Sequence, residues 1–189
     1  MKKMNSKGFT LIELLAVITI MGILMMVAIP AVSRTIENSR RDTFADVAKT
    51  YVNTVRNAVL ADELECGSHS VAATPDGIYY FAIDSSGGTG TSTDIMESGG
   101  KSSWGSADVE GYVKWKKTST DATSTADAKT KTEYFVYLVD TGNHGTSAEI
   151  EENKISRTKI STKTTKKAIS NSVLDPKPTE STAQICTLK

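Results

Sequence analysis

Apolar residues are continuous near the N-terminus of the chain and periodic beyond it. Nineteen of the 24 residues from Phe9 to Val32 are apolar, and no residue between Leu14 and Ser33 is charged. A helix of about 21 residues rises roughly 31 Å, which matches the thickness of a bilayer hydrocarbon core. We therefore expect residues 9–32 to form a helix that can cross a membrane.

Beyond this run the apolar residues recur at steps of three or four, the spacing of one helix face. They are Phe44, Val47, Ala48, Tyr51, Val52, Val55 and Val59. We expect an amphipathic helix over residues 33–64 that continues the first helix and stops at Cys66-Gly67. An unbroken helix over residues 9–64 would measure about 84 Å, so half of it would protrude from a small domain.

After the helix, apolar stretches alternate with clusters of Gly, Ser and Thr, which indicates strands and turns. Strands are predicted at residues 77–83, 112–116, 134–139 and 183–188. Residues 134–139 are apolar on both faces, which is typical of a central strand. Segments 84–107 and 118–132 are typical of loops or of a long hairpin. The predicted fold class is α+β: a long N-terminal helix packed against a C-terminal antiparallel β-sheet, with residues 65–189 as the head domain.

Composition and charge exclude several classes of protein. The 22 Lys and Arg residues balance the 22 Asp and Glu residues, so overall charge gives no reason to expect a nucleic-acid-binding protein. Two cysteines do not make a disulfide-rich scaffold, and together with two histidines they show no zinc-site spacing.

No motif in the sequence indicates catalysis. Ser68-His69-Ser70 and Asp76 contain the residue types of a hydrolase triad, but neither serine lies in a nucleophile elbow. The glycines of residues 87–90 are not followed by the Gly-Lys-Ser/Thr of a phosphate-binding loop. His144 lies in a predicted turn. We therefore predict no enzyme activity, no cofactor, no metal site and no small-molecule substrate.

The first eight residues are basic, with Lys2, Lys3 and Lys7 and no acid. Basic residues before a span and mixed charges after it favour a cytoplasmic N-terminus and an exported C-terminal body. The apolar run also carries Glu13, and a charge in a bilayer needs a partner. Two simpler interpretations stay open: a signal peptide cut near Ala31-Val32-Ser33, or a single-span anchor whose Glu13 reaches the interface.

Residues Lys7-Gly8-Phe9-Thr10-Leu11-Ile12-Glu13-Leu14-Leu15 resemble the class III leader of type IV prepilins and of the related secretion pseudopilins. They combine a basic leader ending in Gly, a following Phe, an acid four positions further and an apolar helix. The resemblance covers residues 1–40 and implies the pilin fold. It also implies that a membrane-embedded prepilin peptidase removes residues 1–8, cutting after Gly8, and methylates the new amino group of Phe9.

The same resemblance implies a function. The precursor would be a single-pass membrane protein, and the processed chain would form a homo-oligomeric helical filament outside the cell. An assembly platform and minor pilins would be its partners. The filament, with this chain as its major pilin, would serve adhesion, surface motility or aggregation. A pseudopilin of a type II secretion or DNA-uptake machine and a simple single-span surface protein are the alternatives.

Cleavage after Gly8 would supply the partner that Glu13 lacks. The positive amine left on Phe9 of one subunit could pair with Glu13 of a neighbour inside an apolar bundle. Leaving the carboxylate unpaired there is costly, whereas the pair itself adds little net stability. We therefore expect the contact to act as a specificity device that sets the axial register of assembly.

Gly22 and Pro30 interrupt the apolar helix. Pro30 lacks an amide hydrogen and leaves the carbonyl of Met26 without its helical donor, which weakens the helix by about 3 kcal/mol unless packing compensates. Related filaments often soften between the matching positions, so the resemblance implies an extensible segment over residues 22–30. An ordinary kinked membrane helix is the other interpretation, since Gly and Pro are common there.

Cys66 and Cys186 are the two cysteines of the chain. In an exported domain we expect them to form a disulfide, which would close a loop of about 120 residues and contribute somewhat under 5 kcal/mol. Many pilins instead place both cysteines close to the C-terminus, and this sequence departs from that pattern. Two unpaired buried thiols stay open as the alternative.

Residues 154–167 contain basic residues and no acid, directly after three glutamates. The basic residues of this candidate stripe are Lys154, Arg157, Lys159, Lys163, Lys166 and Lys167. A solvated face is one interpretation. Repeated along a filament, the stripe would become a binding surface for acidic patches or for anionic polymers, including DNA.

Overall fold

A computed structural model describes residues 9–66, 69–70, 76–83, 102–105, 109–120, 129–140, 142–162 and 183–188. The chain divides into two compact units, residues 1–39 and 40–189, and each is described by itself. The elements in chain order are α1 (Leu11–Leu60), β1 (Leu64–Cys66), β2 (His69–Ser70), β3 (Gly77–Ile83), β4 (Val109–Thr120), β5 (Lys129–Asp140), β6 (Gly145–Thr146), β7 (Ile150–Glu151), η2 (Glu152–Lys154), η3 (Arg157–Lys159), β8 (Ile160–Ser161) and β9 (Ala183–Leu188). The predicted α+β class is confirmed.

The first unit contains the apolar part of α1. The helix is continuous through Gly22 and Pro30, so the softened segment expected between them stays a prediction. Its large apolar side chains are exposed, from Phe9, which is 91% exposed, to Val32. This helix is long and apolar enough to cross a membrane. An apolar surface of this extent needs a cover that is also apolar, either lipid or another protein.

The helix ends at Leu60, four residues before the predicted end at residue 64. Asp62 adopts a left-handed conformation (φ 57°), and the amide of Glu63 donates to the carbonyl of Ala58 at 2.9 Å. This turn closes the helix because it satisfies one of the last free carbonyls. The prediction that the helix stops at Cys66-Gly67 is therefore wrong, and Cys66 is the last residue of β1.

The strands of the second unit form a mixed sheet in the order β2-β1-β9-β3-β4-β5-β6-β8, with β7 also paired to β5. All pairs are antiparallel except β3 with β9. The predicted strands and the central place of β5 are confirmed. The C-terminal strand lies inside the sheet, between β1 and β3, rather than at its edge. The segment 118–132, predicted as loops or a long hairpin, contains the end of β4 and the start of β5 and is therefore a hairpin. In the segment 84–107 the structure describes only residues 102–105.

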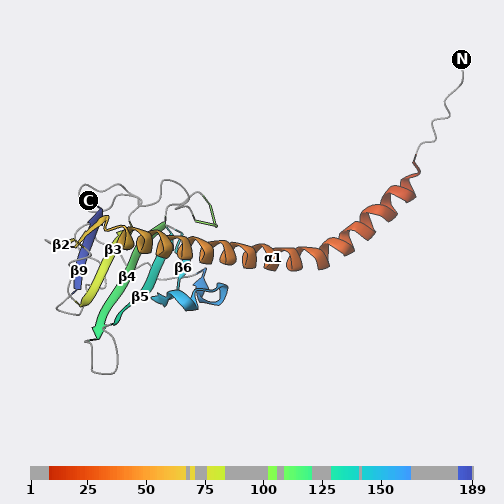
Figure 1. The fold of residues 1–189 in the computed structure, drawn as a ribbon. Helices are drawn as coiled ribbons and strands as arrows, with labels where there is room; N and C mark the ends of the chain where they lie inside the picture. Colours follow the sequence, from red (N-terminus) through yellow and green to blue (C-terminus); the bar gives the residue numbers. More distant parts are fainter. Residues whose placement is uncertain are drawn as a thin grey trace, which may run out of the picture. The chain divides into compact units, whose positions relative to one another are not determined.

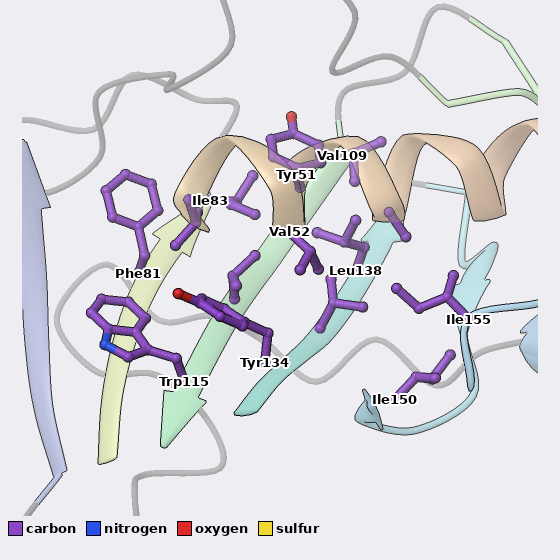
Figure 2. Close-up of a cluster of buried hydrophobic side chains, with 14 of the residues drawn as sticks. Tyr51, Val52, Phe81, Ile83, Val109, Trp115, Tyr134, Leu138, Ile150 and Ile155 are labelled. Atoms are coloured by element: carbon purple, nitrogen blue, oxygen red, sulfur yellow. The ribbon is translucent and has the colours of Figure 1, made fainter. Parts of the chain in front are cut away.

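The C-terminal part of α1 packs across one face of β3, β4 and β5 (Figure 1). Its buried residues are Phe44, Ala45, Ala48, Tyr51, Val52, Val55 and Ala58. Figure 2 shows Val52 on the side of the helix that faces the sheet, with Leu138, Tyr134 and Trp115 on the sheet face toward it, and all four belong to one buried cluster. The predicted apolar stripe thus forms the core of the head, and burial of these side chains is the main favourable term in its folding.

Ion pairs join the segment after β7 to the same helix. The guanidinium of Arg56 pairs with Glu152 of η2 and lies 4.9 Å from the ring centre of Tyr134. Arg157 of η3 pairs with Asp42 at 3.4 Å. Ile150 and Ile155 are buried and belong to the core, as Figure 2 shows. The segment therefore closes one side of the core against α1.

A smaller aromatic cluster lies on the opposite face of the sheet. The ring of Tyr112 packs against Tyr80 and Tyr137, and its hydroxyl donates to Glu149 at 3.2 Å. Burial, and then the negative charge of Glu149, raise the pKa of Tyr112. Because this ring is 6% exposed, the face of β4 that carries Tyr112 is also partly covered, although it points away from α1.

Cys66 and Cys186 form a disulfide, as expected from the sequence. They are direct partners in the antiparallel pairing of β1 with β9, and both are buried. The bridge closes a loop with a sequence separation of 120 residues. It ties the strand that follows the helix to the last strand of the chain.

Candidate functional site at the start of the helix

The residues predicted for processing and assembly lie where α1 begins. Phe9 and Thr10 precede the helix, and Glu13 lies in its first turn. Gly8 and the rest of the predicted leader lie outside the described residues. All three described residues are exposed, so a second molecule can reach them.

Thr10 and Glu13 form a capping box. The backbone amide and the side-chain hydroxyl of Thr10 both donate to Oε2 of Glu13, each at 2.8 Å, and the amide of Glu13 approaches Oγ1 of Thr10 at 3.4 Å. A helix begins with free amide groups, and this arrangement supplies acceptors to two of them. The carboxylate also lies at the positive end of the helix dipole.

This contact gives Glu13 partners from its own chain that are hydrogen-bond donors and not basic residues. Sequence reasoning considered only basic partners and overlooked hydrogen-bond donors close by. The Thr-x-x-Glu spacing directly before an apolar run is a known signature of a capping box and was the available signal. The cap lowers the cost of holding Glu13 in an apolar environment because it replaces part of the lost hydration.

The second oxygen of the Glu13 carboxylate, Oε1, is available to accept a hydrogen bond from another molecule. Within the part of the chain that the structure describes, no hydrogen bond or ion pair reaches Oε1 of Glu13. A carboxylate accepts hydrogen bonds at both oxygens, and a charged donor such as an ammonium group makes the stronger ones. Glu13 can therefore cap its own helix and receive a cationic group from outside at the same time.

The remaining predicted site residues do not belong to the site at the start of α1. Gly22 and Pro30 lie further along α1, and a methyl group added at Gly22 would meet no atom within 4 Å. The basic stripe lies in the second unit, where the structure describes Lys154, Arg157 and Lys159 and not Lys163, Lys166 or Lys167.

The described half of the stripe is largely neutralised. Lys154 pairs with Glu151 at 2.6 Å, and Arg157 pairs with Asp42 at 3.4 Å. Asp42 and Asp46 also line an open groove beside Arg157. These carboxylates oppose the approach of a polyanion, so anionic-polymer or DNA binding stays a prediction that this half of the stripe supports weakly.

Sequence reasoning missed a buried polar cluster in the head. The carboxylate of Asp140, 1% exposed, accepts from the hydroxyl of Ser102 and from the amide of His144, the latter at 2.8 Å. Nδ1 of His144 lies 3.0 Å from the same carboxylate. His144 lies in the turn between β5 and β6, as predicted, and Asn143 of this turn has a φ of 63°. The cluster joins the end of β5 to residues 102–105.

Of the residues considered for catalysis, His69 and Ser70 form β2, and Asp76 directly precedes β3. Ser68 lies outside the described residues, and Asp76 accepts from the backbone amide of Ser119 at 2.6 Å, which joins the start of β3 to the end of β4. This hydrogen bond is the main cause that lowers the pKa of Asp76. Among the described residues there is no group of three or more His, Cys, Asp or Glu side chains that could hold a metal ion.

Residues 3–29 match the family described as prokaryotic N-terminal methylation motif. This is the class III leader of type IV pilins, and the long apolar helix agrees with it. No curated protein and no solved structure matches the chain. The motif supports a type IV pilin-like or pseudopilin-like precursor that prepilin peptidase processes, anchored in the membrane by a single helix.

Proposed function

We propose that this chain is a structural subunit, the major pilin, of an extracellular type IV pilus. Prepilin peptidase would cut after Gly8 and methylate Phe9. The observation that carries the proposal is the methylation motif at residues 3–29, placed on an exposed apolar helix that continues into a disulfide-bonded head. The filament would mediate adhesion, surface motility or aggregation through the heads.

Assembly would exchange the surroundings of the apolar helix. Before assembly its exposed side chains contact lipid, and in the filament they contact the helices of other copies. Lipid tails are as apolar as Leu, so this exchange gains little hydrophobic free energy. The preference for the filament must then come from close packing and from polar contacts, which makes the start of the helix decisive.

The polar contact we propose joins the Phe9 amine of one copy to Glu13 of its neighbour. Neither charge is stable alone in an apolar bundle, and each satisfies the other. A subunit out of register by one helical turn would leave both unpaired. The pair would therefore select one axial register more than it would add to the overall stability of the filament.

Residues 22–30 are proposed as the segment that softens when the filament is stretched. Pro30 cannot donate to the carbonyl of Met26, so this turn of α1 holds fewer hydrogen bonds than its neighbours. Pro30→Ala restores the missing donor. We expect filaments of this variant to extend less at a given pulling force, measured by optical tweezers, with Ala28→Ser as a control that leaves the backbone donors unchanged.

Two measurements test the central proposal. Mass spectrometry of the N-terminus of the mature chain should find methylated Phe9, whereas an intact Met1 would indicate a simple anchor and a start near Arg34 a secreted domain. Glu13→Ala should abolish sheared filaments and leave the processed protein in the membrane. Glu63→Ala, which removes an exposed carboxylate in the second unit, is the control and should assemble normally.

The alternative is a pseudopilin, which would share the same leader and the same processing. Electron microscopy of cells, with antibody against the head, distinguishes the two. A major pilin labels along the full length of surface filaments, and its deletion removes them. Unchanged filaments in the deletion strain, together with loss of protein secretion or DNA uptake, would contradict the pilus proposal and support the pseudopilin.

A further inference from the structure

We propose that Thr10 is a positioning residue for assembly. By holding Oε2 of Glu13 within its own chain, it directs Oε1 toward the amino group of an adjoining copy. This inference rests on the proposed function, because it assigns the residue that prepares the Glu13 carboxylate for the pairing described above.

The geometry of the capping box carries the inference. Both donors of Thr10, its amide and its hydroxyl, reach the same carboxylate oxygen at 2.8 Å. Oε2 is thus occupied twice, and no described residue donates to Oε1. A contact shared between the two oxygens would have left one acceptor site on each, whereas here both donors lie on Oε2 and both sites of Oε1 stay open to a partner.

Fixing the carboxylate has a physical consequence for binding. A free Glu side chain samples many rotamers and loses that freedom when it binds a partner. In this chain the cap restrains the side chain before the partner arrives, which is the general route by which preorganisation increases affinity. Thr10 also follows Phe9 directly, so each copy carries its own amine beside the residue that orients its Glu13 for the amine of another copy.

A purely structural role for Thr10 makes a different prediction. If Thr10 only begins the helix, removing its hydroxyl weakens the helix start whether or not residue 13 is charged, because the amide oxygen of a Gln at position 13 still accepts a hydrogen bond. If Thr10 acts through the Glu13 carboxylate, removing the hydroxyl matters only while that carboxylate is present. A double-mutant cycle separates the two roles.

The experiment uses the full-length chain in cells that assemble it. A tagged variant is expressed together with the wild type, and the ratio of the two is measured in sheared filaments and in membranes. The variants are Thr10→Val, which keeps the shape and loses the hydroxyl, Thr10→Ser, which keeps the hydroxyl, Glu13→Gln, and Thr10→Val combined with Glu13→Gln. Mass spectrometry checks cleavage and methylation of each.

We expect Thr10→Val to lower incorporation about three- to tenfold, the range for loss of one ordinary, solvent-accessible hydrogen bond. Thr10→Ser should incorporate like the wild type. Glu13→Gln should incorporate less than Thr10→Val, and adding Thr10→Val to it should cause no further loss. Cleavage and methylation should be equal in all variants.

Three results would overturn the inference: normal incorporation of Thr10→Val, an equal effect of Thr10→Val with and without Glu13→Gln, or a defect that lies in cleavage. Failure of the proposed Phe9–Glu13 pairing itself is recognised by a different variant, Glu13→Gln. If Glu13→Gln itself incorporates like the wild type, the pairing of Glu13 with Phe9 is wrong, and the role assigned to Thr10 is overturned with it.

Discussion

The indole ring of Trp104 lies flat on the imidazole ring of His144, with ring centroids 4.6 Å apart and an interplanar angle of 5°. Asp140 holds the imidazole from one side, while Trp104 also contacts Phe44 of α1 at a centroid distance of 5.7 Å. Residues 102–105 are therefore fixed both to the turn after β5 and to the helix. A stacked pair of this kind contributes about 0.5 to 1.5 kcal/mol beyond the area that it buries.

Replacing Asp140 should destabilise the head. Asp140→Ala leaves the hydroxyl of Ser102 and the amide of His144 without their acceptor, and buried unpaired donors cost about 1 to 3 kcal/mol each. We expect a loss of about 3 kcal/mol in the free energy of unfolding, measured by urea denaturation of the detergent-solubilised chain with tryptophan fluorescence. Asp46→Ala removes an exposed carboxylate and should change stability by less than about 0.5 kcal/mol. Equal losses in both variants would contradict this role.

The disulfide should contribute strongly to stability. Replacing both Cys66 and Cys186 with Ser removes the cross-link from a long loop, and we expect a loss of about 3 to 5 kcal/mol in urea denaturation. A reducing agent should lower the unfolding midpoint of the wild type and leave that of the double variant unchanged. Detection of free thiols in the native wild-type chain would contradict the bridge.

Gly111 should not tolerate a side chain. Its φ is 155°, and a Cβ atom built there would collide with the backbone carbonyl of Tyr137 on β5. We expect Gly111→Ala to cost more than about 2 kcal/mol, measured as a lower melting temperature by circular dichroism. Gly105 is the matched control, because its φ is 157° but a Cβ atom would meet nothing within 4 Å. Gly105→Ala should cost about 1 kcal/mol, the price of the backbone conformation alone.

Asp76 should make part of the stability of the head depend on pH. The amide of Ser119 holds the pKa of Asp76 below its ordinary value of 3.8, so the folded state favours the carboxylate. The contribution is complete above that value and is lost as the pH falls through the lower pKa of the folded state. Asp76→Asn should therefore melt below the wild type at pH 6, and the difference should shrink below about pH 4. A difference that stays constant down to pH 2.5 would contradict this.

Much of the fold follows from local patterns in the sequence. The helix face and the four strands are predictable because a period of 3.6 or of 2 residues reports which side chains are buried. The place of β9 inside the sheet and its parallel pairing with β3 depend on contacts between distant segments, which no local pattern contains. The end of the helix at Leu60 depends on one residue, Asp62, that adopts a left-handed conformation.

The candidate site was predictable in part. Glu13 stands out because it is a lone charge in an apolar run, and Gly8 and Phe9 because of the leader that they belong to. The role of Thr10 was also within reach, since its spacing from Glu13 is a capping signature. In contrast, Ser102 and Asp140 lie 38 residues apart in sequence and meet only in the folded head, so their contact could not be predicted.

The bridge between β1 and β9 also determines how the head carries load. Force that enters along α1 reaches Cys66 shortly after the helix ends, and there the covalent path divides into two arms of a closed ring. A residue gripped anywhere in that ring is separated from Cys66, along the shorter arm, by at most half of the sequence separation of 120. Tension therefore cannot draw the head out into a single long tether, even if every strand pulls apart.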